Sequence, residues 1–272
     1  MAAEEGKIDP MHQFEVQSIA DFSLGGYNLA FTNSALWMLI TLVVLWVFML
    51  GGMKRQLVPG RWQAAVEGVT GFISSMMTTN IGPEGRKYTP YVFSIFMFIL
   101  IANLLGMLPL GLFAPVTHGV PVAEQLSHPF TVTSHLTITG VLAVVSFALV
   151  LAVGFARHGF HFFSLFVPHG APWWMLPILI PVEFVSFMVR PFSLGLRLFV
   201  AMTAGHILLK VLGGFVINGM NAEALWVAPV VALPSFILMI GISALELLVA
   251  VIQAYVFALL TSLYLNDAVN LH

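Results

Sequence analysis

The sequence predicts an all-α membrane protein with about five membrane-embedded helices and one amphipathic helix on the membrane surface. Of its 272 residues, 59% are hydrophobic and only 8% are charged, whereas a soluble domain carries roughly 25% charged residues. Several apolar runs without charge are also long enough to cross a bilayer, which takes about 20 helical residues. These observations exclude a soluble protein, because so few charged side chains could not cover its surface.

The first 34 residues are predicted to form a polar tail outside the membrane. The segment up to Ile19 is acidic and lacks the short apolar core of a signal peptide. Its acidic residues are Glu4, Glu5, Asp9 and Glu15. Residues 35–272 are predicted to form a single membrane domain.

Three apolar runs predict ordinary membrane-spanning helices at residues 35–53, 91–113 and 136–155, because none of them contains a charged residue. The segment from residue 62 to 79 is less apolar and contains Glu67 together with several serines and threonines. It is predicted to be an amphipathic helix that lies along the membrane surface.

The last two apolar stretches, residues 173–217 and 224–265, are far longer than a membrane crossing requires. Each would extend over roughly 63–66 Å as a helix, about twice the roughly 30 Å thickness of the hydrocarbon core. Neither contains a polar turn that would divide it, and membrane helices rarely tilt by more than about 40°. They therefore predict a long, tilted helical hairpin that is bent at its prolines. Helices lying so flat imply a protein partner beside them.

Positively charged residues orient the predicted helices. Loops that stay in the cytoplasm, or in the matrix of an organelle, are enriched in lysine and arginine. Such residues occur in segments 54–87 and 157–172, whereas segment 114–130 contains none. The N-terminus is therefore expected outside the membrane and the C-terminus inside, after five passes.

Several polar side chains lie within the predicted hairpin, where a charge costs about 2.5–3.5 kcal/mol and often marks an ion path. Glu183, Arg190 and Arg197 are seven residues apart and share one helical face, with Ser186 close to it. His206 follows Arg197 by nine residues and lies on roughly the opposite face. Two separate polar tracks are therefore expected.

The second track continues on the last helix, where Glu246 and Gln253 are again seven residues apart. His206 and Glu246 together could transfer protons or could form a buried structural pair. Gln253 could line the path or make an interhelical hydrogen bond, and Arg197 could form a structural salt bridge. Lys210 is expected to anchor the outer interface.

These residues lie in motifs that resemble a known family. The run Pro191-Phe-Ser-Leu-Gly-Leu-Arg197-Leu-Phe, followed by Ala204-Gly-His206, resembles the penultimate helix of subunit a of F-type ATP synthases. Leu245-Glu246-Leu and Ile252-Gln253-Ala-Tyr-Val-Phe resemble its last helix, and Asn103-Leu-Leu-Gly-Met-Leu-Pro109 resembles its second span. The resemblance covers nearly the whole chain.

The resemblance implies a role for each candidate residue. Arg197 would be the essential arginine that faces a carboxylate on the rotating c-ring. The outer proton half-channel would be lined by His206, Glu246 and Gln253. The inner half-channel would be lined by Glu183, Ser186 and Arg190. Many members of the family carry asparagine where this chain has Ala201, so one polar contributor to the path is replaced or missing.

The resemblance also implies partners and a location. The chain would be the proton-translocating stator subunit, which couples proton flow to ATP synthesis and has no catalytic chemistry of its own. Its partners would be the c-ring proteolipids, b-type subunits of the peripheral stalk, and lipids. The order of His206 and Glu246 is that of alphaproteobacterial and mitochondrial forms, so the location would be a bacterial inner membrane or, alternatively, a mitochondrial inner membrane.

A stand-alone ion-coupled secondary transporter is the main alternative. Such folds often contain internal repeats, and the two halves of this sequence show none. Ten lysines and arginines without a basic stripe exclude nucleic acid as a partner. No cofactor or metal is expected, because cysteine is absent and the histidines lack the spacing of metal ligands. His158, His161 and His169 are predicted to be solvated loop residues.

Overall fold

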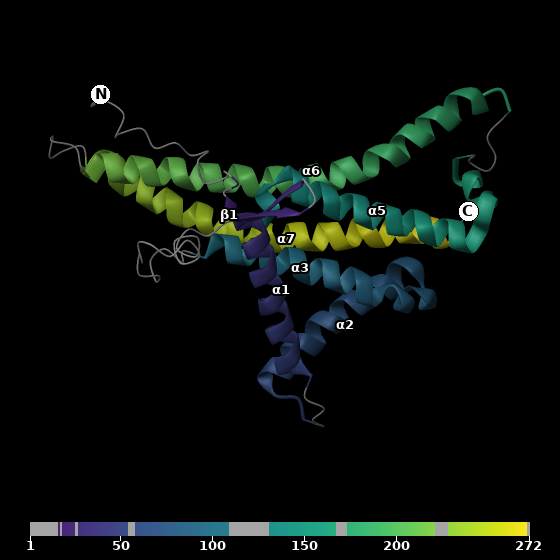
Figure 1. Cartoon of the computed structure of the whole chain (residues 1–272), viewed down its shortest axis with the longest axis horizontal. Helices are drawn as coiled ribbons and strands as arrows, with labels where there is room; N and C mark the ends of the chain where they lie inside the picture. Colours follow the sequence, from purple (N-terminus) through teal and green to yellow (C-terminus); the bar gives the residue numbers. More distant parts are fainter. Residues whose placement is uncertain are drawn as a thin grey trace. The chain divides into compact units, whose positions relative to one another are not determined.

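The computed structural model describes residues 16, 18–24, 27–53, 58–108, 131–166, 173–220 and 228–270 (Figure 1). Most of the described chain is helical, which confirms the predicted fold class. It divides into two compact units, each of which is built from three separate segments. Unit 1 comprises residues 1–40, 102–135 and 199–252, and unit 2 comprises residues 41–101, 136–198 and 253–272.

Two strands in the N-terminal tail form the only sheet among the described residues. Strand β1 (Ser18–Leu24) pairs antiparallel with β2 (Tyr27–Thr32), and the ladder is irregular between Ser18 and Ala20. No strand is predicted in this tail from its polarity. The missed signal is the Gly-Gly pair between two segments that contain aromatic residues, which is typical of a tight β-hairpin.

The three predicted spans correspond to the helices α1 (Asn33–Gly52), α3 (Thr89–Met107) and α5 (Leu136–His158). The second span is predicted to extend to residue 113, whereas α3 ends at Met107; residues 109–113 lie outside the described residues. Pro109 explains this, because a proline disfavours helical backbone at the residue before it. The α-helical part of the third span ends before Gly159, whose φ of 54° is left-handed, and the chain continues as the 3-10 helix η5 (Gly159–Phe166).

The predicted amphipathic helix is α2 (Arg61–Ile81). Its buried side chains recur along one face and include Val66, Ile73 and Met77, while most of the others are exposed. Trp62 joins its start to α1, because the indole nitrogen donates a 2.8 Å hydrogen bond to the carbonyl of Phe48. The helix ends at Gly82, whose φ is 90°, and is followed by the 3-10 helix η2 (Pro83–Lys87).

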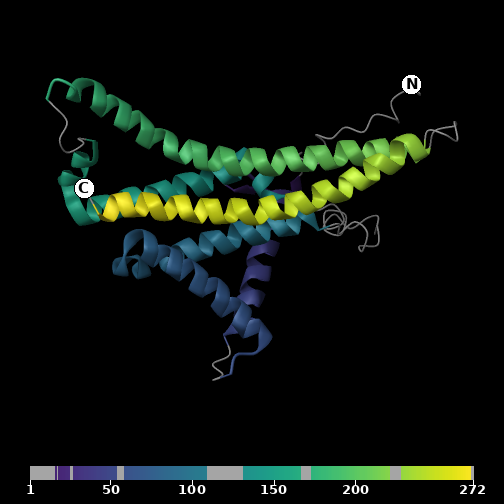
Figure 2. The ribbon, with the colours of Figure 1, turned by 180° about the vertical axis from the view of Figure 1, so that it is seen from behind.

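The last two helices are both far longer than a membrane crossing requires. Helix α6 (Leu176–Met220) has 45 residues, and α7 (Leu233–Val269) has 37 residues after the π-helical turn η6 (Ala228–Ala232). They correspond to about 68 and 56 Å, against a hydrocarbon core of roughly 30 Å. Figure 2 shows both as long ribbons, green for α6 and yellow for α7. Among the described residues, five helices are long and apolar enough to cross a membrane.

Candidate functional site

Within unit 1, His206 of α6 faces Glu246 of α7. The imidazole Nδ1 lies 3.6 Å from Glu246 Oε1. Glu246 is only 2% exposed, and neither of its carboxylate oxygens accepts a hydrogen bond from the described residues. A buried carboxylate without such bonds is costly, so its hydrogen-bonding capacity is available to a mobile proton or to water.

A glycine makes room for this acid. A side-chain Cβ placed on Gly205 would lie 2.7 Å from Glu246 Oε1, well inside normal contact distance. The close approach of α6 to α7 at this level therefore depends on the missing side chain.

Thr131 holds the other side of the imidazole. Its Oγ1 lies 2.7 Å from His206 Nε2, and the residue immediately precedes the 3-10 turn η4 (Val132–Ser134). Sequence reasoning missed Thr131, because it is 75 residues from His206 and belongs to no helical pattern.

Asn103 of α3 connects η4 to α7. Its amide nitrogen donates to the carbonyl of Ala250 at 3.2 Å, and its Oδ1 accepts a 2.6 Å hydrogen bond from Thr133. Asn103 and Thr133 are completely buried. Ala250 lies one helical turn beyond Glu246, so this contact fixes α7 close to the acid.

Arg197 lies on an exposed face of α6 within unit 2. The guanidinium makes no hydrogen bond or ion pair with any of the residues that the structure describes. Its neighbours Leu194 and Leu198 are buried, at 3% and 1% exposure, while Leu196 is exposed on the same side as Arg197. The helix therefore packs on its own subunit with one face and presents the arginine on the other.

Arg190 has the opposite environment in the same unit. Its Nη1 forms a 2.6 Å ion pair with Asp267 Oδ2 of α7. The guanidinium carbon also lies 5.4 Å from the ring centre of Phe187 and 5.1 Å from that of Tyr264, which are cation–π distances. Arg190 thus joins the N-terminal half of α6 to the C-terminal end of α7.

The remaining predicted residues lie in unit 2 without such contacts. Glu183 and Gln253 are half-buried, and Ser186 is exposed. None of the three side chains hydrogen-bonds to the described part of the chain. The structure therefore brings together His206 and Glu246, commits Arg190 to Asp267, and leaves the other polar groups open.

Comparison with known proteins identifies the family. A family model described as ATP synthase A chain matches residues 35–266. The proteins named ATP synthase subunit a from Sphingopyxis alaskensis and Rhizorhabdus wittichii are 72% and 69% identical over 100% of both chains. The protein of the same name from Rhodospirillum rubrum is 43% identical over 97% of this chain and 99% of its own.

The chain belongs to the ATP synthase subunit a family. It is therefore the proton-translocating stator subunit of an F-type ATP synthase, embedded in a membrane in complex with other membrane-sector subunits. The resemblance inferred from the motifs is confirmed, and a stand-alone transporter is not favoured.

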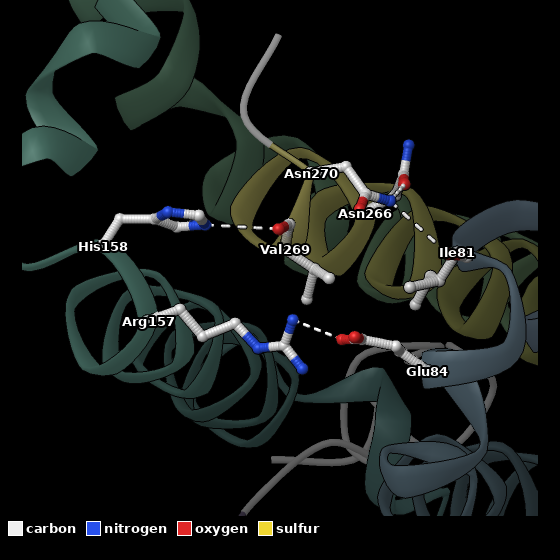
Figure 3. A network of polar contacts seen from close by, with 7 residues as sticks. All are labelled: Ile81, Glu84, Arg157, His158, Asn266, Val269 and Asn270. Carbon is white, nitrogen blue, oxygen red and sulfur yellow. Dashed lines mark hydrogen bonds and ion pairs between the residues drawn. The ribbon is translucent and has the colours of Figure 1, made fainter.

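Unit 2 of this subunit a also contains a polar network at the end of α7 (Figure 3). Arg157 of α5 forms an ion pair with Glu84 of η2. Asn270 donates to the carbonyl of Ile81 at 3.4 Å and to Asn266 Oδ1 at 2.7 Å. The network therefore connects α2, η2, α5 and the end of α7.

His158 corrects one prediction. It was expected to be a solvated loop residue, but it is the last residue of α5 and its Nε2 lies 3.2 Å from the carbonyl oxygen of Val269. The helix extends past the expected end at residue 155 because Ala156 and Arg157 are compatible with helix and the first breaker is Gly159. His161 is exposed in η5, and His169 lies outside the described residues. No group of His, Asp or Glu in the described ranges could hold a metal ion.

Proposed function

We propose that this subunit conducts protons through two offset half-channels that meet only at the c-ring, with Arg197 facing the ring carboxylate. The exposed guanidinium of Arg197, which has no acid among the described residues, carries this proposal. A charge inside the bilayer costs several kcal/mol unless it meets protein or water. The acid that would stabilise Arg197 is therefore expected from another subunit.

The outer half-channel would use the polar groups of α6 and α7 that the chain leaves available. His206 and Glu246 are 3.6 Å apart, and the Glu246 oxygens have no hydrogen-bond donor among the described residues. A proton could pass between such groups after a small side-chain movement or through one water. Gln253 would continue this path toward the ring.

The inner half-channel would be lined by Glu183 and Ser186, which share a face of α6 with Arg197. Arg190 would form part of its wall. Because Arg190 is tied to Asp267, its role there would be to shape the path and repel cations rather than to bind the ring.

Arginine suits the division between the half-channels because it remains protonated in proteins. A guanidinium favours the charged form of a nearby carboxylate. A ring site that reaches Arg197 would therefore release its proton to the inner half-channel before it rotates to the outer one. The fixed positive charge would also block direct proton flow between the two, so that protons cross only by turning the ring.

The proposed setting is a bacterial inner membrane, with the N-terminus outside and the C-terminus inside. The proposed neighbours are the c-ring proteolipids, b-type peripheral-stalk subunits and lipids. Support comes from bacterial relatives and from the exposed apolar side chains along α6 and α7. A mitochondrial inner membrane is the alternative setting.

Arg197→Ala in the complete complex, reconstituted in vesicles, tests the proposal. Proton-driven ATP synthesis should fall to background while the complex still assembles, as judged by co-purification of the small ring proteolipid. Thr137→Val is a suitable control, because Thr137 is exposed on α5 and makes no side-chain hydrogen bond with the described residues. Normal synthesis with Arg197→Ala would exclude the mechanism.

Glu246→Gln tests the outer half-channel separately. Glutamine keeps the size of the side chain but does not release a proton at neutral pH. We expect passive proton flux through the membrane sector to fall about tenfold or more, with assembly unchanged. Wild-type flux would mean that His206 and Glu246 form only a structural pair.

A further inference from the structure

We propose that Thr131 is a positioning residue for His206, and this inference rests on the proposed outer half-channel. Its hydroxyl oxygen accepts a hydrogen bond from Nε2–H of the imidazole and thereby keeps Nδ1 turned toward Glu246. Both nitrogens of the imidazole lie near a partner: Nε2 is 2.7 Å from Thr131 Oγ1, and Nδ1 is 3.6 Å from Glu246 Oε1.

We assign the acceptor role to the threonine hydroxyl, which can both donate and accept hydrogen bonds. A neutral ring carries one proton, and the hydrogen bond made by one nitrogen decides which nitrogen holds it. A proton on Nε2 leaves a lone pair on Nδ1, directed at the acid. By accepting from Nε2–H, Thr131 would therefore favour the tautomer whose Nδ1 can take up a proton and pass it to Glu246.

Thr131 is itself held in place. It is only 5% exposed, and its carbonyl accepts hydrogen bonds from both the amide and the hydroxyl of Ser134, at 3.0 and 2.6 Å. Thr203, which lies three residues before His206 on α6, donates to the carbonyl of Ser134 at 3.3 Å. The turn and α6 are therefore joined at two points, which keeps the Thr131 backbone beside the imidazole.

The neighbouring elements also accommodate this position. A Cβ on Gly106 of α3 would overlap Thr131 Oγ1, so the hydroxyl fits only because that residue is glycine. On the other side of the turn, Thr133 binds Asn103, and Asn103 binds the carbonyl of Ala250. The same turn thus controls the position of His206 on α6 and of α7 beside Glu246.

The proton step needs no rotation of the His206 imidazole. The Nδ1 atom takes a proton from water, which produces an imidazolium. It then passes that proton to the Glu246 carboxylate, which restores the neutral imidazole and produces the carboxylic acid. The Nε2–H bond to Thr131 persists throughout. The separation of 3.6 Å exceeds a direct hydrogen bond, so the transfer occurs after a small side-chain movement or through one water.

Thr131→Val, which keeps the shape and removes the hydroxyl, tests the proposal in the reconstituted complex. We expect passive proton flux to fall about three- to tenfold, as for the loss of one hydrogen bond. Thr131→Ser restores the hydroxyl and should keep flux within about twofold of wild type. Wild-type flux with Thr131→Val, or an equal loss with Thr131→Ser, would overturn the proposal.

A double variant separates positioning from a general structural effect. In a His206→Gln background, Thr131→Val should cause no further loss, because the ring that it positions is absent. A further loss of similar size would mean that Thr131 acts elsewhere. If His206→Gln and Glu246→Gln both keep wild-type flux, the proposed outer half-channel fails as well, which is a different result from failure of Thr131→Val alone.

A spectroscopic measurement covers the case in which Thr131→Val does not assemble. Nitrogen NMR of the wild-type complex with labelled histidine reports which nitrogen of His206 is protonated, with His206→Gln identifying its signals. We expect the neutral ring to carry its proton on Nε2. A neutral ring protonated on Nδ1 would contradict the inference.

Discussion

Arg190 and Arg197 are identical in type, lie seven residues apart on one face of α6, and belong to the same unit, yet their burial and their ion-pair partners differ. Arg190 is half-buried, bound to Asp267 at 2.6 Å and flanked by Phe187 and Tyr264. Arg197 is exposed and has no ion pair among the described residues. The helical face alone therefore does not decide the role of an arginine, and the acid available on α7 does.

This difference has a simple energetic basis. A paired guanidinium inside the membrane sector stabilises the packing of its own chain, because removing one partner leaves the other charge unsatisfied. An arginine without an ion pair inside its own chain stays available to an acid of another subunit. The same helix therefore carries one arginine for its own fold and one for the proposed contact with the ring.

Arg→Lys exchanges at the two positions should give the largest difference. Lysine keeps a positive charge in water but loses its proton more readily when desolvated, and it lacks the planar fork of arginine. We expect Arg197→Lys to lower proton-driven ATP synthesis at least tenfold, and Arg190→Lys to lower it less than about threefold. Similar rates for the two variants would show that their environments are functionally equivalent.

Asp267→Asn should have an intermediate effect, on stability rather than on flux. The side chains of Arg190 and Asp267 are 22% and 38% exposed, so water screens the pair partly, and we expect a loss of about 1 kcal/mol or less. This corresponds to a fall of about 2–4 °C or less in the midpoint at which subunit a unfolds in the detergent-solubilised complex.

The Arg190→Gln background provides the control for this variant. If the ion pair is the cause, Asp267→Asn should add little once Arg190 has been replaced. Additive losses would mean that the two residues act through different contacts, and the contrast with Arg197 would then lose its structural basis.

The helices could be predicted from the sequence because they depend on runs of apolar residues and on spacing within one element. The five spans, the amphipathic α2 and the unusual lengths of α6 and α7 all follow from such local patterns. The juxtaposition of His206 and Glu246 was also accessible, because two long helices in one hairpin bring such residues to the same level.

Contacts with segments outside the hairpin could not be predicted in the same way. Thr131 lies 75 residues from His206, and its turn has no periodic pattern that would place it there. Asp267 is 77 residues from Arg190, and without the register of α6 against α7 the sequence does not show which arginine it meets. The β-hairpin and the early end of α3 had sequence signals in Gly25-Gly26 and Pro109, but composition alone did not reveal them.

Removing the ion pair between Arg157 and Glu84 should have the smallest effect on stability of these substitutions. This ion pair connects α5 with η2 (Figure 3), but its side chains are 28% and 53% exposed. Exposed pairs contribute about 0–1 kcal/mol and are screened by salt. Arg157→Gln should therefore lower the unfolding midpoint less than Arg190→Gln does, by an amount that shrinks in high salt, and should leave proton flux unchanged. A fall in the unfolding midpoint as large as that of Arg190→Gln would show that burial does not determine how much each ion pair stabilises the fold.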